Sequence, residues 1–334
     1  MQSTDRWTTP IKTLVGFTLF FGIVSGYVLF GQSLDIPSKK WGLSIGNSKE
    51  FTGLRFNFRD SKVRRITGVN FTLWQPRKDN KDAVVRGVSL GLIPGGGDIQ
   101  GMQVGLLGVS AEKSMVGLNV GGLGVGSGNN ITGINIGGFG VGAGKNLTGL
   151  SIGGLGVGTG GSLKGFCIGG LGVGAGKNVS GLCIGGLGVG AGADLTGLAI
   201  GGLGAGAGRN FTGLALAGLG AGCGGRFTGI AISGLGAGAP DVRGLIVGGL
   251  GVGGKYLKGV FVGGALIKVD KGGRLSGLAV SSCNWVSGTL NGLSIGIVNY
   301  AWKLNGGIQV GLINIVRDNP KGLKVLPIFN ADFD

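Results

Sequence analysis

The sequence predicts an all-β protein: a glycine-rich parallel β-solenoid of 16-residue coils with two strands each, preceded by one transmembrane helix. The first observation is a sequence motif, apolar-x-Gly-apolar-x-apolar, whose glycine recurs every sixteen residues from Gly101 to Gly229. A fixed short period is typical of an array in which each unit stacks on its neighbours. The second observation is an alternation of apolar and small residues inside each copy, which indicates strands.

The composition supports a folded array. Glycine provides 82 of the 334 residues, but it accompanies Leu, Ile and Val at fixed phases, which is not the pattern of a disordered segment. Lys and Arg outnumber Asp and Glu by 30 to 14. Because the basic residues concentrate close behind an apolar segment, we expect them to meet a membrane surface, and we expect no nucleic-acid partner.

The chain begins with a polar tail, residues 1–12. Residues 13–34 carry no Lys or Arg and are mostly apolar, and about twenty such residues suffice for a helix to cross a bilayer. We therefore predict a single-pass membrane anchor that binds lipid. A cleaved signal peptide is the alternative, and the flanking charges leave the side of the membrane open.

Residues 35–98 contain the same motif with irregular spacing, in copies that begin at Phe51, Ile66 and Val85. We predict that they form the opening coils of the array, with charged loops. Terminal repeats of an array are expected to be atypical. The basic residues predicted to contact lipid headgroups are Lys39, Lys40, Arg64 and Arg65. The alternative is a solvated basic face that keeps the protein soluble.

Residues 99–282 form the regular array. In one copy Leu150 and Ile152 are two residues apart, so they are expected on the same side of one strand. A turn at Gly153 and Gly154 follows, and then the similarly spaced pair Leu155 and Val157. We expect these four apolar residues to form a dry core between two parallel sheets, with the other corner near residues 144–146. Seventeen or eighteen coils spaced by about 4.8 Å would give a rod on the order of 80 Å long.

The small residues that alternate with these apolar residues are then expected to form a flat outer face. A sheet without bulky side chains lets another sheet approach closely, so we predict a docking face for another protein or a second copy. The alternative is that glycine only keeps the coil thin. The predicted face consists of Gly149, Ser151, Gly156, Gly158, Gly165, Cys167, Gly172 and Gly174.

Cys167 and Cys183 occupy the same phase of neighbouring copies, so their sulfur atoms are expected to be adjacent. Other copies carry small residues at this position, which favours the interpretation that the two cysteines are simply small side chains. A disulfide between them is the alternative.

Residues 283–334 replace glycine with larger residues and are predicted to cap the array. Asn299 and Asn314 fall at matching phases, so their side chains are expected to form a ladder. The stretches 292–299 and 308–315 and the ending 326–330 resemble the short surface repeats of bacterial envelope proteins, the spirochaete-type surface-repeat family. The resemblance covers mainly residues 283–334 and implies a bacterial cell envelope, with no site residues.

No catalytic, cofactor or metal site is expected, because the chain has no His, no recurrent acidic pair and no cysteine cluster. The sequence therefore predicts a non-enzymatic, membrane-anchored scaffold or docking subunit. Two alternatives stay open: an outer-membrane β-barrel pore built from an antiparallel meander, and a secreted ice- or surface-binding adhesin. The adhesin would use threonines that recur at one phase, namely Thr132, Thr148, Thr196, Thr212 and Thr228.

Overall fold

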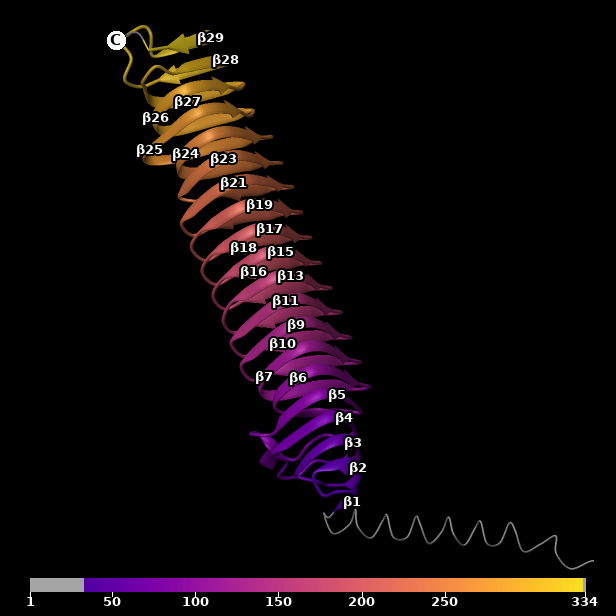
Figure 1. Ribbon diagram of the computed structural model, residues 1–334. Helices are drawn as coiled ribbons and strands as arrows, with labels where there is room; N and C mark the ends of the chain where they lie inside the picture. Colours follow the sequence, from indigo (N-terminus) through magenta and orange to yellow (C-terminus); the bar gives the residue numbers. More distant parts are fainter. Residues whose placement is uncertain (1–32, 333–334) are drawn as a thin grey trace, which may run out of the picture. The chain divides into compact units, whose positions relative to one another are not determined.

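The computed structural model describes residues 33–332, which form 29 strands and one short 3-10 helix (Figure 1). They divide into two compact units with a boundary after Gly144, and we call residues 33–144 the first unit and residues 145–332 the second unit. The predicted tail, 1–12, and residues 13–32 of the predicted membrane helix lie outside the described residues. Ser33 and Leu34, which were assigned to that helix, begin a strand instead. Within 33–332, no helix has the length and apolar character needed to span a membrane.

The first unit begins with irregular coils and continues into the regular array. Its elements are β1 (Ser33–Pro37), β2 (Trp41–Gly46), β3 (Glu50–Arg59), β4 (Arg65–Trp74), η1 (Lys78–Asn80), β5 (Val84–Gly91), β6 (Gly95–Gly105), β7 (Gly108–Gly121), β8 (Gly124–Ser127), β9 (Asn130–Gly137) and β10 (Gly140–Ala143).

The second unit contains the rest of the regular array and the closing coils. Its strands are β11 (Asn146–Gly153), β12 (Gly156–Thr159), β13 (Leu163–Gly169), β14 (Gly172–Ala175), β15 (Val179–Gly185), β16 (Gly188–Ala191), β17 (Leu195–Gly201), β18 (Gly204–Ala207), β19 (Phe211–Ala217), β20 (Gly220–Cys223), β21 (Arg226–Ser233), β22 (Gly236–Gly238), β23 (Asp241–Gly248), β24 (Gly251–Gly263), β25 (Leu266–Val280), β26 (Cys283–Ile295), β27 (Val298–Leu304), β28 (Ile308–Val316) and β29 (Val325–Ala331).

The coils stack in parallel and in register, which confirms the predicted β-solenoid. In the second unit the long strand β11 pairs in parallel with β13, and the short strand β12 pairs with β14, so that Gly149 lies beside Gly165 and Val157 beside Val173. Among the strand pairs described, only β1 with β2 and β28 with β29 run antiparallel. The antiparallel meander considered as an alternative is therefore wrong, and the pore function that depended on it loses its support.

A glycine with positive φ bends the long strand of each coil from β2 to β26. Seven such glycines in the first unit and ten in the second have φ between +112° and +137°, among them Gly149 and Gly165. A side chain is strained at such φ values, and a Cβ on Gly165 would also overlap the carbonyl oxygen of Gly149 in the coil below. The sequence placed the special backbone conformation at the Gly153 and Gly154 corner, whereas the structure places it inside the strand.

The interior differs from the predicted core. Val157 is buried as expected, but Leu150 and Ile152 lie on the outside and Leu155 is half exposed at a corner, whereas Ser151 is fully buried. The predicted core was therefore wrong for three of its four residues. The physical reason is the width of the coil: in the coils from Leu147 to Phe227, one large side chain together with one Val or Ala and one small residue fills the space between the strands.

The interior rows show this compensation of volume. Where the large residue is Phe211 or Phe227, the same coil carries Ala221 or Ala237 at the position of Val157. The row that begins at Leu147 continues with Leu163, Val179, Leu195, Phe211, Phe227, Val242, Leu257, Leu275 and Leu290, and the row that begins at Ser151 continues with Cys167, Cys183, Ala199, Ala215, Ala231, Ile246, Phe261, Ala279 and Ser294.

Buried amide side chains form a ladder in the closing coils, which confirms the prediction for Asn299 and Asn314. Asn284 Nδ2 donates to Asn299 Oδ1 at 2.8 Å, and Asn299 Nδ2 donates to Asn314 Oδ1 at 2.8 Å. The amide groups of Asn299 and Asn314 thus find partners in the neighbouring coils, as buried polar groups require, whereas Asn284 Oδ1 accepts no hydrogen bond from the described residues. The antiparallel strand β29 then covers β28 and ends the ladder.

Candidate functional site

The outer surface of the long strands carries three parallel rows of apolar side chains, which we call the apolar face. In the second unit the inner row is Leu150, Phe166, Leu182, Leu198, Leu214, Ile230, Leu245, Val260, Leu278 and Leu293; the middle row is Ile152, Ile168, Ile184, Ile200, Leu216, Ile232, Val247, Val262, Val280 and Ile295; and the outer row is Leu155, Leu171, Leu187, Leu203, Leu219, Leu235 and Leu250.

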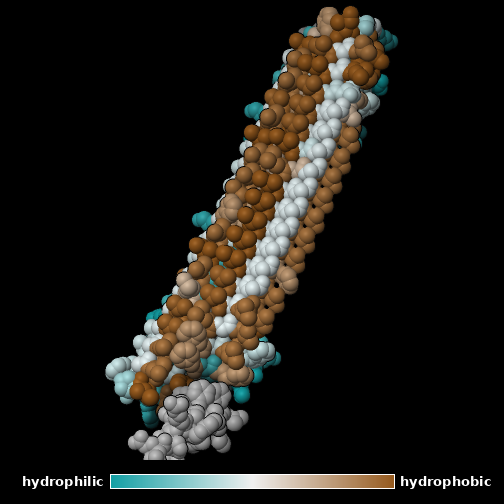
Figure 2. All heavy atoms as spheres, turned by 90° about the vertical axis from the view of Figure 1, so that its right-hand side faces the viewer, coloured by the Kyte–Doolittle hydropathy of each residue, from teal (hydrophilic) through white to brown (hydrophobic). Residues whose placement is uncertain are grey.

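The outer row is the most exposed of the three. Its leucines are between 46% and 58% exposed, although backbone hydrogen bonds from coil to coil hold their positions, for example Leu171 N to Leu155 O at 2.6 Å. Figure 2 shows the hydrophobic rows in brown, running along the stack with a pale row between them. No position in the three rows is charged, so the apolar surface is uninterrupted from coil to coil.

An exposed row of glycines separates the middle row from the outer row. It comprises Gly154, Gly170, Gly186, Gly202, Gly218, Gly234 and Gly249. These positions must be glycine, because a Cβ on Gly170 would overlap the carbonyl oxygen of Gly154 in the next coil. The glycine row therefore leaves a groove between two ridges of larger side chains.

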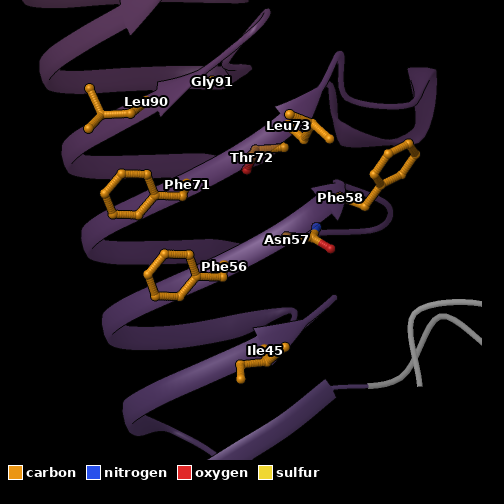
Figure 3. A pocket seen from close by; sticks show the side chains of 9 residues that line it. All are labelled: Ile45, Phe56, Asn57, Phe58, Phe71, Thr72, Leu73, Leu90 and Gly91. Atoms are coloured by element: carbon orange, nitrogen blue, oxygen red, sulfur yellow. The ribbon is translucent and has the colours of Figure 1, made fainter. Parts of the chain in front are cut away.

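Hollows lie beside these rows in the opening coils of the first unit and in the closing coils of the second unit. In the first unit a groove of about 350 Å³ lies between one row that contains Ile45, Phe56, Phe71 and Leu90 and a second row that contains Phe58 and Leu73 (Figure 3). The rings of Phe56 and Phe71 stack with centroids 4.9 Å apart. In the closing coils of the second unit, a groove of about 550 Å³ follows the same positions, between Val280, Ile295 and Val310 on one side and Ile297 and Leu312 on the other.

The predicted docking face of small residues is only partly on the surface. Ser151 and Cys167 are fully buried, so their assignment to an outer face was wrong. Gly149 and Gly165 are the bend glycines described above. Gly156, Gly158, Gly172 and Gly174 do lie on the outside of the short strands, as predicted. Sequence reasoning missed the apolar face because it assigned the same leucines and isoleucines to the core.

The threonines that suggested an ice-binding surface lie in a single row. In the second unit Thr148, Thr196, Thr212 and Thr228 share this row with Lys164 and Ser180, which interrupt it. The row borders the bend glycines and does not form a broad flat array of hydroxyl groups.

Three of the four basic residues predicted to contact headgroups line one pocket of the first unit. Lys40, Arg64 and Arg65 surround a pocket of about 360 Å³ together with Glu50 and Thr52. Lys39 is exposed in the turn before β2 and does not line it. Arg64 Nη1 lies 3.3 Å from Glu50 Oε1, and both side chains are exposed. Three cations against one carboxylate leave the pocket positive, which suits an anionic group.

Charged residues of the second unit form ion pairs along one edge of the stack. The bend glycines lie between this edge and the apolar face. Arg209 Nη2 lies 2.6 Å from Asp194 Oδ2, and Arg226 Nε lies 2.6 Å from Asp241 Oδ2. Burial alone would raise the pKa of Asp241, but hydrogen bonds from Arg226 and Arg243 outweigh it and hold that pKa below its usual value.

Cys167 and Cys183 are register partners in adjacent coils, as predicted, and both are free and fully buried. The hydrogen bond to Cys183, together with burial, raises the pKa of the Cys167 thiol. A buried thiol that stays protonated is a poor nucleophile, so the pair serves as small interior side chains.

No protein-family model, curated protein or solved structure matches this chain. The apolar face and the basic pocket are therefore the features of the molecule that indicate its function.

Proposed function

We propose that this protein is a structural scaffold or docking subunit whose apolar face forms protein–protein contacts. The observation that carries the proposal is the repetition of three exposed, uncharged apolar rows along the stacked long strands. Soluble monomers seldom expose contiguous apolar patches larger than a few hundred Å². A face with this many large side chains is therefore expected to be covered in the working protein.

The fold suits a scaffold. Each coil is held by in-register backbone hydrogen bonds to its neighbours, so the side chains of the apolar face have a fixed spacing. A partner that matches this spacing meets the same pattern at every coil. Contact energy then accumulates with the number of coils engaged, as expected of a repeat array with an extended binding surface.

The proposal also retains a membrane setting. Residues 13–32 have the composition of a single-pass anchor, and the resemblance of the closing coils to envelope repeats favours a bacterial cell envelope. The basic pocket of Lys40, Arg64 and Arg65 supports a contact between the first unit and anionic headgroups.

Replacing Leu187, Leu203 and Leu219 together with lysine is expected to reduce the assembly formed by the full chain to a single chain. Each substitution places a charge on the outer row, where a covering partner would have to bury it without compensation. The mass of the purified protein in a mild non-ionic detergent, measured by light scattering, checks this expectation.

The matched control replaces Ser180, Thr196 and Thr212 with lysine. These residues belong to the same three coils but lie on the polar side of the bend glycines. The control is expected to keep the mass of the original assembly. An unchanged mass in the leucine variant would show that the apolar face does not mediate association.

In bilayers that contain phosphatidylserine, Lys40 is expected to react several-fold more slowly with an amine-modifying reagent than in bilayers of phosphatidylcholine alone. Anionic headgroups attracted to the basic pocket would cover its amine. Mass spectrometry of the modified peptides gives the two rates, with Lys177 on the second unit as the internal control. Equal rates for Lys40 in the two bilayers would contradict a headgroup contact at this pocket.

A further inference from the structure

We infer that the partner of the apolar face in the second unit is the same face of a second copy of this chain, with the two copies running in the same direction. This inference rests on the proposed function, since it names the occupant of the face proposed there. It follows from the area of the face, from the pattern of its ridges and groove, and from the position of its charges.

The area of the face matches what a stable pair of proteins needs. The width from Leu150 to Leu155 is about 17 Å of strand, and the seven coils that carry all three rows rise by about 34 Å. The inner and middle rows of three further coils bring the area to about 670 Å² per copy, which lies within the roughly 600–1,000 Å² that each partner contributes to a standard stable interface. A second copy thus supplies enough apolar surface without any further component.

The surface shape of the apolar face is complementary to the same face of a second copy. The outer row of leucines is a ridge, and the adjacent glycine row is a groove of the same length and the same coil spacing. In a pair related by a two-fold axis that is parallel to the stacking direction and centred on the face, the middle row of each copy lies over the groove of the other. Ile200, for example, would then lie over Gly202 of the other copy, and all three rows would be covered.

This symmetry also sets the direction of the pair. A two-fold axis perpendicular to the stacking direction would place leucine row over leucine row and leave the two grooves facing each other, empty. The axis parallel to the stack fills both grooves and brings identical coils together. A closed pair of this kind uses the same patch twice, as most homo-oligomers do.

The charges favour a second copy over a lipid surface at this face. Elements that lie on an anionic bilayer usually carry Lys and Arg beside their apolar side. Here the borders of the apolar face are the bend glycines on one side and the short-strand glycines, such as Gly156 and Gly158, on the other. Two copies can therefore meet without placing like charges opposite each other, although the whole chain carries a net charge of +16.

Cysteine crosslinking of the full chain, in the membranes of the cells that express it, tests the inference. Cys223 and Cys283 are first replaced with alanine, whereas Cys167 and Cys183 are fully buried and are kept. Leu155→Cys and Leu250→Cys are then made separately. The probe is a bis-maleimide with a flexible reach of about 16 Å, because the two outer rows are separated by about 13 Å along the strand direction and by the sheet spacing of about 10 Å. Each variant is expected to crosslink to itself, and adding Leu187→Lys, Leu203→Lys and Leu219→Lys should reduce the product at least tenfold. The lysine control set at Ser180, Thr196 and Thr212 should leave it unchanged.

Other outcomes would overturn the inference in distinguishable ways. Crosslinking only in cells that make both variants together would show an antiparallel pair and overturn the parallel arrangement. No self-crosslink, with an assembly whose mass still exceeds one chain and depends on the three leucines, would overturn the second copy but leave the proposed docking function standing. A single chain that also binds no anilinonaphthalene sulfonate, a dye for exposed apolar surface, would contradict both.

Discussion

Replacing Gly181 with alanine is expected to lower the free energy of unfolding of its coils by more than about 3 kcal/mol. Gly181 has φ +125°, and a Cβ there would overlap the carbonyl oxygen of Gly165 in the neighbouring coil. The substitution combines backbone strain with a clash that only a separation of the two coils can relieve. The stacking hydrogen bonds on both sides of the bend are therefore expected to weaken.

Hydrogen–deuterium exchange of peptides that cover residues 163–194 measures this effect locally, which matters because a repeat array need not unfold in one step. Gly174→Ala is the matched control. It lies on the outer side of the short strand β14, and a Cβ there would be 3.8 Å from the nearest atom, Gly190 O. The control is expected to be neutral or to stabilise by roughly 0.5–1 kcal/mol, because glycine is unfavourable inside a strand. Equal protection in the two variants would show that the bend does not require glycine.

This contrast separates two kinds of glycine that look the same in the sequence. The period of sixteen residues was enough to predict coils, parallel pairing and register, because each depends only on repetition. Which glycine bends the strand depends on contacts with the coil below. Those contacts become visible only once the coils are stacked.

The direction in which side chains point was the main error of sequence reasoning. Alternation shows that Leu150 and Ile152 share one side of a strand, but it does not show which side is the interior. The structure places them outside because Leu147 and Val157 already fill the narrow coil. The position between Leu150 and Ile152 did indicate the correct side, because Ser151 and its equivalent Cys167 in the next coil are both small. Small residues recur there because the space inside the coil is limited.

The same interior position holds a basic residue in one opening coil. Arg55 occupies the position of Ser151 in an opening coil, where other coils of the first unit place Asn70, Ser89 and Gln103. It is fully buried, and so are those three residues. The row is thus an interior polar column at the start of the array, and an arginine in it must be neutralised inside the protein.

Replacing Arg55 with methionine is expected to cost about 3–5 kcal/mol in the opening coils, because it leaves a buried carboxylate without its partner. Arg55 Nη1 lies 2.6 Å from Asp60 Oδ1 and 2.9 Å from Asn70 Oδ1, and Arg55 Nε donates to Ser48 Oγ at 3.0 Å. Asp60 is 3% exposed, so water cannot replace these interactions. Hydrogen exchange of peptides spanning residues 51–72 measures the loss.

Two further variants show whether the buried charge is the cause. Arg64→Met removes the exposed ion pair with Glu50 and is expected to change stability by less than about 1 kcal/mol. Combining Arg55→Met with Asp60→Asn removes both buried charges, and the double variant is expected to recover more than half of the lost protection. In that variant the side-chain oxygen of residue 60 can still accept from Asn57, and its new NH2 group can donate to the hydroxyl oxygen of Thr72. If the double variant is as unstable as Arg55→Met, the loss comes from packing of the long arginine side chain and not from an unpaired carboxylate.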